Sequence, residues 1–561
     1  MAAIASAAIV ALLSLAANQA NAGGGTAVTP ILFTPFSAET IDNRAFDTTL
    51  GGAADVVVGL QLLRSFDGIA FDNVNPPNPT IAVSPSLILA VTNGTIRVLS
   101  KDGTSLATKT LTGFFAPVAQ PGDFLTDPRA IYDSGRFFVS LASRRSSPFA
   151  AFFLLAVSST ADPTDPWNYY ALNAAVDNTT PTMNFVDLPS LGVDDNAIYL
   201  TGNMFDMPTF SFQGAKIRVV PKIPLLSGSP ASFFDFSNLS AGGQRVFYLQ
   251  AAQSIGPNPV GYIVNTRFPN ACSLTLWRVS NPPNSDPQLF FVDFDVGGDC
   301  GAPPNASQPD TTARIETGGP RLVNAVWRNG SIWTAAAVAK NFGSGTVSST
   351  RVFQIDTRSF PAISEVQDFL QGSDGVYTYY PVVTVDQRGD LALAYNQSSP
   401  TEYVSVHFAG QLASAPRNQP LTPQLLQPGL ASYVLLDSQS RNRWGDYNGI
   451  ALDPTDDTFW VLGEYANTPA NTWGAVAGNL AFNFPTPAPT RTATGTRTAS
   501  PTVTGTASPT VTSTPLPSRT ATSTPSATST PTVTATATAT RTFTPTATAT
   551  STPTATNSST A

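Results

Sequence analysis

Short runs of apolar residues, separated by polar turns, recur along most of this chain. In residues 187–205 a Pro opens an apolar run, an Asp-rich turn follows, and a second apolar run returns. Related phrases occupy residues 127–140, 319–336 and 380–396. The runs are rich in β-branched and aromatic residues, which favour strands, and the breaks in Gly, Pro, Asn and Asp, which favour turns. The pattern therefore predicts a series of similar β-hairpins.

The hairpins repeat at intervals of about 50 to 70 residues, as in folds built from stacked or radial repeats. Seven copies align on the Pro that opens each hairpin or, in the last copy, on an Asp. The aligned positions are Pro79, Pro128, Pro189, Pro259, Pro320, Pro381 and Asp446. Each copy has room for about four short strands, and the 3.6-residue periodicity of helices is absent.

Sheets of four strands are only marginally stable alone, but sheets arranged around an axis bury both of their faces. The sequence therefore predicts an all-β fold, a β-propeller of seven blades, with six or eight blades as alternatives. A ring also needs its two ends joined. Residues 446–482 supply three strands of the last blade, and we expect the run from Val56 to Leu63 to add the fourth.

Composition divides the chain into four parts. Residues 1–22 have the apolar run and the small-x-small end of a secretory signal peptide. Residues 23–54 form a leader with little pattern, and residues 55–484 hold the predicted propeller. Residues 485–561 are dominated by Thr, Pro, Ala and Ser, so we expect a disordered stalk or tail. The protein is then secreted or on the cell surface.

Charge and rare residues exclude several classes of protein. The chain has 37 acidic and 29 basic residues, whereas nucleic acids and anionic membranes call for a basic face. His407 is the only histidine, which argues against a His-dependent triad or a His-based zinc site. Its alternating neighbours predict a place on a strand surface. In an exported chain Cys272 and Cys300 most simply form one disulfide, two free thiols being the alternative.

Several phrases resemble a family of secreted bacterial β-propeller proteins that are mostly uncharacterised. They are Pro-Pro-Asn-Pro-Thr-Ile-Ala-Val-Ser-Pro at 76–85, Asp-Leu-Pro-Ser-Leu-Gly-Val at 187–193 and Gly-Asp-Tyr-Asn-Gly at 445–449. This chain departs from the family pattern at Asn78, where Asp is usual, and at Ser84, where Gly is usual. The resemblance implies a propeller and export, and it brings no settled catalytic residues. A more distant similarity is to the sialidase-like propellers, whose Asp-box is approached by residues 100–104.

Residues that open the innermost strand of a propeller blade face the central channel. In this chain those positions carry Asp127, Arg129, Asp187, Arg321, Tyr380 and Asp446. Carboxylates mixed with Arg could hold a cation such as Ca²⁺, bind a sugar or an anion, or act as acid and base in glycoside cleavage. Each Asp could also simply cap the turn before its strand. No cofactor is required by any motif.

Trp444 lies in the phrase Arg-Asn-Arg-Trp-Gly-Asp at 441–446, beside two Arg and a channel Asp. It is the best candidate among the tryptophans for stacking on a sugar or another ligand. These features favour an exported, non-enzymatic propeller, a monomer that acts as a binding or adhesion module for an extracellular glycan or protein. The alternative is a sialidase-like glycoside hydrolase or lyase that uses channel carboxylates.

Overall fold

The computed structural model describes residues 27–36, 59–267, 271–280 and 286–483. The chain divides into two compact units, Met1–Pro487 and Ala488–Ala561, and all described residues belong to the first. The predicted signal peptide (1–22), the start of the predicted closing strand (56–58) and the predicted tail (485–561) lie outside the described residues.

Antiparallel meanders of four strands are the building unit, and three of them form separate four-stranded sheets. The first sheet holds β3 (Thr80–Val83), β4 (Leu87–Val91), β5 (Thr95–Ser100) and β6 (Ser105–Thr110). Another holds β27 (Tyr377–Val385), β28 (Leu391–Ser399), β29 (Glu402–Gln411) and β30 (Gln424–Gln427). The third holds β31 (Gly449–Leu452), β32 (Phe459–Asn467), β33 (Thr472–Phe482) and β2 (Leu60–Ala70).

A further meander carries one extra strand. It holds β7 (Phe124–Asp133), β8 (Arg136–Ser146), β9 (Phe149–Ser158) and β10 (Trp167–Asn173). The short strand β1 (Ile31–Phe33) pairs with β10 and makes this sheet five-stranded. The predicted leader is thus not loose at residues 31–33, because Ile-Leu-Phe pairs with the otherwise open edge of β10.

The largest sheet has 12 strands and contains three successive meanders. The first consists of β13 (Asn184–Val193), β14 (Ala197–Asp206), β15 (Phe212–Pro221) and β16 (Phe234–Phe236). The second consists of β19 (Gln250–Ser254), β20 (Val260–Thr266), β21 (Ser273–Ser280) and β22 (Gln288–Asp295). The third consists of β23 (Leu322–Arg328), β24 (Ser331–Asn341), β25 (Thr346–Asp356) and β26 (Ser364–Gln371). The repeat predicts separate sheets, but β19 pairs in parallel with both β13 and β23. The described strands therefore form five large sheets.

The connecting segments hold two ribbons and two short helices. The ribbons are β11 (Val176–Asp177) with β12 (Thr180–Pro181) and β17 (Ser240–Ala241) with β18 (Gln244–Arg245), and the helices are α1 (Leu111–Phe114) and α2 (Lys222–Leu226). Neither helix in the described residues has the length or the hydropathy needed to span a bilayer.

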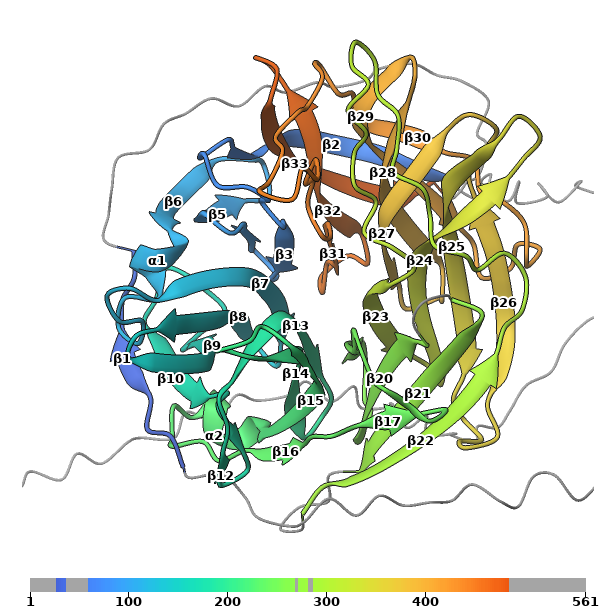
Figure 1. Cartoon of the computed structure of the whole chain (residues 1–561). Coiled ribbons are helices and arrows are strands. Elements are labelled where there is room, and N and C mark those ends of the chain that lie inside the picture. Colours follow the sequence, from blue (N-terminus) through green and yellow to red (C-terminus); the bar gives the residue numbers. More distant parts are fainter. Residues whose placement is uncertain (1–26, 37–58, 268–270, 281–285, 484–561) are drawn as a thin grey trace, which may run out of the picture. The chain divides into compact units, whose positions relative to one another are not determined.

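The large sheets of the first unit surround a central axis, with the first strand of each meander nearest to it (Figure 1). This confirms the prediction of an all-β propeller. The core lies between neighbouring sheets. Leu89 of β4, Phe137 of β8 and Phe114 of α1 belong to one buried cluster, in which the rings of Phe114 and Trp167 lie 5.1 Å apart. Burial of such apolar area is the main stabilising contribution to folding.

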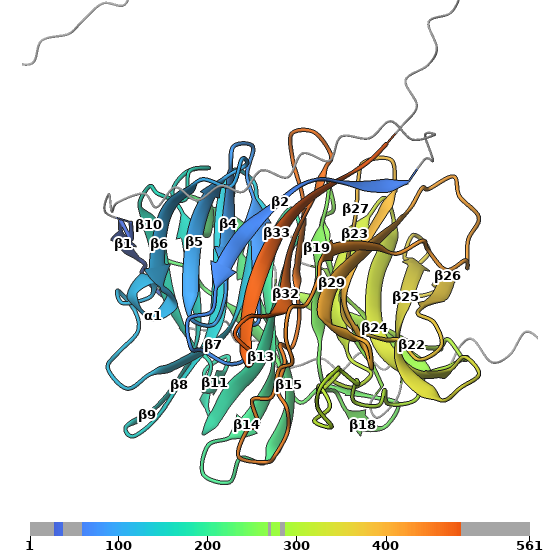
Figure 2. The same cartoon turned by 90° about the horizontal axis from the view of Figure 1, so that it is seen from above.

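The ring is closed by pairing between strands from the two ends of the first unit. β2 runs antiparallel to β33, from Leu60 opposite Phe482 to Ala70 opposite Gly474 (Figure 2). This confirms the predicted closure, although the strand begins at Leu60 and continues to Ala70 rather than spanning 56–63. Leu60 and Ile69 are buried in this arrangement.

The residue before the Pro of a repeat adopts an unusual backbone conformation. The φ angle is positive at Asn78, Asp127, Leu188, Gly319 and Tyr380. In β7, β13 and β27 the ladder register shifts at this position, which is a β-bulge. A residue before Pro ordinarily has an extended backbone, and a non-Gly residue with positive φ is disfavoured by about 1 kcal/mol or more. This strain is repeated at one end of the channel.

The disulfide prediction is confirmed, because Cys272 and Cys300 are joined, with their Cα atoms 5.0 Å apart. The bridge links the start of β21 to the segment after β22. His407 lies on β29 as expected, but it is not on the surface. Its side chain is 11% exposed, its Nε2 lies 2.8 Å from Oε1 of Glu402, and its ring stacks against that of Tyr395.

Candidate functional site

A pocket of about 520 Å³ opens at the end of the channel where the strained residues lie. Its lining comes from the starts of several first strands, including Asp127 of β7 and Asp187 of β13. Arg321, just before β23, and Asp446, before β31, also line it. The bulges interrupt the ladder here, which turns these side chains toward the axis rather than into a sheet face.

Charged side chains of both signs line this channel pocket in equal number. The acids are Asp127, Asp187, Glu316 and Asp446, and the arginines are Arg144, Arg321, Arg441 and Arg443. The acids and the arginines do not all pair with one another, because some of these side chains are held in close ion pairs and others are not.

Asn78 joins two of the carboxylates. Its Nδ2 donates to Oδ1 of Asp127 at 2.6 Å and lies 3.3 Å from Oδ2 of Asp446, while the backbone N–H of Asp446 donates to Oδ1 of Asn78. Asn93 accepts from the backbone N–H of Asp127 at 2.7 Å. The amide at position 78 therefore does something a carboxylate could not, since an Asp there could not donate to the two acids.

Arg443 holds two of the acids in place. Its Nη2 lies 2.8 Å from Oδ2 of Asp446, and its Nε lies 3.0 Å from Oε2 of Glu316. Arg441 is bound mainly by Asp437, at 2.7 Å, and lies 3.9 Å from Glu316. These two arginines and their acids form one wall of fixed charge.

Arg321 and Arg144 are held mainly by aromatic rings instead. The guanidinium of Arg321 lies 4.2 Å from the ring centre of Tyr248, and its only ion pair among the described residues is a 4.0 Å approach to Asp446. The guanidinium of Arg144 lies 4.8 Å from each of Phe124 and Phe185, and no described acid pairs with it. Both cations are positioned by cation–π contacts, which leave their N–H donors available to a ligand.

The aromatic rings continue as a contiguous wall beside the pocket. Phe185, Phe205, Phe212, Phe247 and Tyr248 follow one another with ring-centre distances of 5.8, 5.6, 5.1 and 4.2 Å. Phe205, Phe247 and Tyr248 line the pocket directly, as does Phe124 on the other side of Arg144. A polar pocket with one aromatic wall is typical of sites that bind a ring-shaped polar molecule.

Burial and neighbouring charge alter the acids. Burial, together with the nearby carboxylates of Asp187 and Asp446, raises the pKa of Asp127 to about 7, although the hydrogen bond from Asn78 opposes the shift. Burial and Asp446 also raise the pKa of Asp187. No described residue donates a hydrogen bond to the carboxylate of Asp187. The pocket thus contains one acid that is half protonated near neutral pH and one acceptor without a partner.

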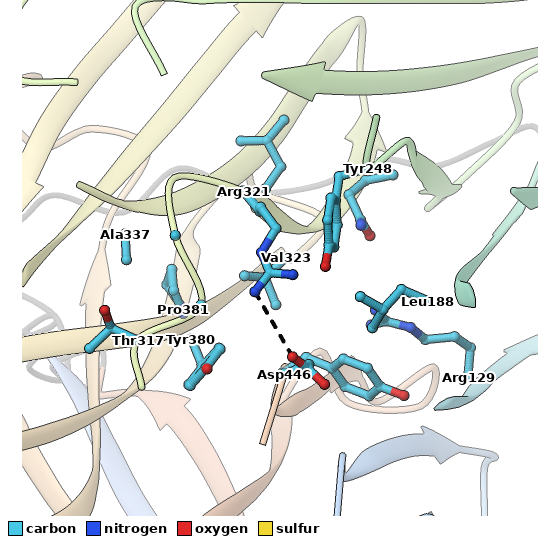
Figure 3. Close-up of a pocket in the computed structure, with 15 residues that line it drawn as sticks. Arg129, Leu188, Tyr248, Thr317, Arg321, Val323, Ala337, Tyr380, Pro381 and Asp446 are labelled. Carbon is cyan, nitrogen blue, oxygen red and sulfur yellow. Dashed lines mark ion pairs between the residues drawn. The ribbon is translucent and has the colours of Figure 1, made fainter. Parts of the chain in front are cut away.

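A smaller cavity of about 20 Å³ adjoins the pocket and shares Tyr248, Arg321 and Asp446 with it (Figure 3). Arg321 points toward Asp446 across it, and Tyr380 lies to one side. The hydroxyl of Tyr380 donates to the backbone carbonyl of Glu316 at 3.1 Å. Arg129 lies against the ring of Tyr447 at 3.4 Å and donates to the carbonyl of Pro189. The side chains of Tyr380 and Arg129 are thus both held in place by contacts within the protein.

The structure brings six of the seven predicted ligand-binding candidates together. Asp127, Asp187, Arg321 and Asp446 line the channel pocket, whereas Arg129 and Tyr380 line the smaller cavity that adjoins it. The prediction for Trp444 is wrong. Its side chain is fully buried, packs edge-on against Tyr433 at 4.7 Å and directs its indole N–H toward Asn396, so a ligand cannot reach it.

Sequence reasoning missed Arg144, Glu316 and the aromatic wall. Arg144 lies on the second strand of its meander, where the repeat gives no signal. The phrase Arg-Asn-Arg-Trp gave one sequence signal for the additional residues, because its two arginines, Arg441 and Arg443, both line the pocket. The Asp residues in the turns that follow the first strands behave as turn chemistry predicts. For example, Asp194 accepts from the backbone N–H groups of Asn196 and Ala197 at 2.7 Å.

No group of acids, His or Cys within the described residues has an arrangement suited to a metal ion. The channel acids are instead separated by Asn78 and by arginines, which would oppose a cation.

No family model matches the chain, and no curated protein matches it. Solved structures with a similar arrangement include the Trypanosoma rangeli sialidase bound to the inhibitor DANA, at 10% identity and a TM-score of 0.34, covering 74% of this chain and 59% of that one. A neuraminidase-like protein of subtype N10 from a little yellow-shouldered bat influenza A virus shows 8% identity and a TM-score of 0.34, covering 62% of this chain and 99% of that one. An ancestral GH74 enzyme shows 10% identity and a TM-score of 0.37, covering 80% and 52%.

These structures are propellers. The chain spans 59% of the trypanosomal sialidase and 52% of the GH74 enzyme. At such identities the likeness concerns the general fold only, and it carries no argument about ligand or reaction.

Proposed function

We propose that this protein is an exported β-propeller that binds an acidic carbohydrate in the channel pocket. The observation that carries the proposal is the pair Arg144 and Arg321. Both guanidinium groups face a pocket of about 520 Å³, and both are held by aromatic rings rather than by close acids. A carboxylate on the ligand would supply the charge-assisted hydrogen bonds that these two side chains lack.

The carboxylate of Asp187 suits the hydroxyl groups of a sugar. Asp187 has no hydrogen-bond donor among the described residues, and sugar hydroxyls are donors. Asp127 can accept a second hydrogen bond when it is ionised and donate one when it is protonated. Both forms are present near neutral pH, because its pKa is about 7. The aromatic wall from Phe205 to Tyr248 offers a flat apolar surface for one face of a sugar ring. A pocket of this volume holds one or two sugar units.

The ring and its location complete the proposal. Counting each four-strand meander as one blade gives seven blades, with β2 completing the last, and the strand pairing supports this count. Export is supported by the signal-like composition of residues 1–22 and by the disulfide, since disulfides persist in oxidising compartments. A propeller carried on the Thr/Pro-rich segment would serve as a binding or adhesion module at a cell surface.

A glycan panel that includes uronic-acid oligosaccharides tests this function. We expect the protein to bind acidic glycans and to bind neutral ones of the same linkage much more weakly. Arg321→Gln and Arg144→Gln should each weaken binding roughly 10- to 100-fold, because each removes a charge-assisted contact. The matched control is Arg64→Gln, an exposed arginine of β2 that donates to the carbonyl of Lys101. Equal binding by all four proteins, or no binding to any acidic glycan, would contradict the proposal.

A second candidate function, glycoside hydrolysis, is favoured by one observation. Asp127 has a pKa near 7 and lies beside other carboxylates, as a general acid in glycoside cleavage must. If the site is catalytic, Asp127→Asn lowers kcat for a chromogenic uronide by roughly 10²- to 10⁴-fold while the glycan still binds. Binding without turnover by the unmodified protein would leave the binding module as the function.

A further inference from the structure

A second pocket, of about 220 Å³, lies between the meander β23–β26 and the meander β27–β30. It is remote from the channel pocket. β23 begins next to Arg321 of the channel pocket and ends at Arg328 of this one. Seven residues of a strand, at about 3.3 Å each, place the two sites roughly 20 Å apart.

The lining of this second pocket is unusual for an acidic protein. The chain has a net charge of −8, yet none of the described residues that line the pocket is acidic. Four arginines line it, Arg328, Arg358, Arg388 and Arg417, together with the amides of Gln354, Gln367 and Gln411. Trp333, whose side chain is buried, forms part of the wall.

Acids outside the lining hold two of the arginines in place. The Nε of Arg388 donates to Asp390 at 2.8 Å, and its Nη2 binds Asp386. Arg358 pairs with Asp356 at 2.6 Å. These pairs fix the guanidinium groups at the rim before any ligand arrives, which reduces the loss of side-chain entropy on binding.

Other polar groups in the pocket have no partner. The Nε of Arg328 and the Oε1 of Gln367 are both buried, and neither forms a hydrogen bond. Arg417 forms no ion pair with a described residue. The amide of Gln367 is held in one orientation, because its Nε2 donates to Oε1 of Gln411 at 2.8 Å. Buried polar groups are nearly always satisfied in folded proteins, so an unpaired donor and acceptor in one cavity suit a polar ligand.

We propose that the second pocket binds a small ligand through an oxyanion, a sulfate, phosphate or carboxylate group. Arg328 and Arg417 supply positive charge for that group, because neither forms an ion pair with a described residue and Asp457 and Asp386 act on Arg328 only from a longer distance. Arginine forks match the geometry of oxyanions. The three glutamines hydrogen-bond the polar body of the ligand and set which ligands fit. Because no acid lines the site, it selects anions more strictly than the channel pocket does.

Calorimetric titration with sodium sulfate tests the proposal, with chloride added to keep the ionic strength constant. A parallel titration with glucuronate distinguishes an inorganic oxyanion from a sugar acid. Arg328→Gln and Arg417→Gln should each weaken binding about tenfold or more. Arg64→Gln should leave the binding of both anions unchanged, and Arg321→Gln should leave sulfate binding unchanged, which separates the site from the channel pocket. Glucuronate is also titrated into the Arg321→Gln protein, because the channel pocket is itself proposed to bind uronic acids. Thermal unfolding of each variant checks that it is folded.

Crystals soaked in selenate locate the site independently. Selenate density against Arg328 supports the proposal whichever titrant binds more tightly. Two results would overturn it: sulfate binding that Arg328→Gln and Arg417→Gln do not alter, or no binding of either anion by the Arg321→Gln protein.

Discussion

A chain that begins at residue 71 is expected to lose most of its stability, although among the described strands it lacks only the short strand β1 and the outer strand β2 of one sheet. β2 covers β33 along nine paired positions and buries Leu60 and Ile69. Without it the ring is open, and two sheets expose apolar faces to water. We expect a loss on the order of 5 kcal/mol or more, which is comparable to the total stability of many domains.

The matched control restores the same residues at the other end of the chain. Asn483 donates its backbone N–H to the carbonyl of Gly59, so the end of β33 already lies beside the start of β2. A chain of residues 71–483 followed by a short turn and residues 59–70 should therefore recover a cooperative unfolding transition. Both chains lack β1, so only β2 differs between them. Equal stability of the two in urea unfolding would show that β2 does not close the ring.

Asp127→Asn is expected to stabilise the protein at pH 8 and to change its stability little at pH 4. The folded-state pKa of Asp127 is about 7, whereas its ordinary value is 3.8. Between these two values the folded protein binds more protons than the unfolded chain, so the free energy of unfolding decreases as the pH rises from about 4 to about 7. Below that window both states are protonated and the penalty is absent.

The asparagine variant does not titrate, so it lacks this decrease. Its Oδ1 can still accept from Asn78, and asparagine tolerates the positive φ at this position. We expect the variant to exceed the unmodified protein by on the order of 3 kcal/mol at pH 8, with a difference that grows from pH 4 to pH 7. Urea unfolding across this range measures it. A difference that is constant with pH would show that Asp127 titrates normally in the folded protein.

The propeller could be predicted from the sequence because the repeat that produces it runs along most of the chain. The repeated Pro, apolar run and Asp turn recur often enough to define a period, and the unpaired apolar run before Phe66 was the natural partner for the last sheet. The joining of three meanders into one sheet could not be predicted, since the parallel contact of β19 with β13 and β23 depends on how closely first strands approach the axis.

The candidate site was predicted in part, for a similar reason. Asp127, Asp187, Arg321 and Asp446 all lie within two residues of the aligned position of their repeat, so one placement located all of them. Arg144 reaches the same pocket from a second strand, and only its contacts with Phe124 and Phe185 reveal its role. Trp444 was misjudged because its polar sequence neighbours suggested exposure, whereas Tyr433 and Asn396, distant in sequence from one another, enclose the indole.

The most direct test of the channel pocket is a crystal structure of the protein with an acidic oligosaccharide that it binds on the glycan panel. We predict that the sugar carboxylate contacts Arg321 or Arg144, that a hydroxyl contacts Asp187, and that one ring face lies against Tyr248 or Phe247. A sugar bound elsewhere on the propeller, with the channel pocket holding only solvent, would contradict the account.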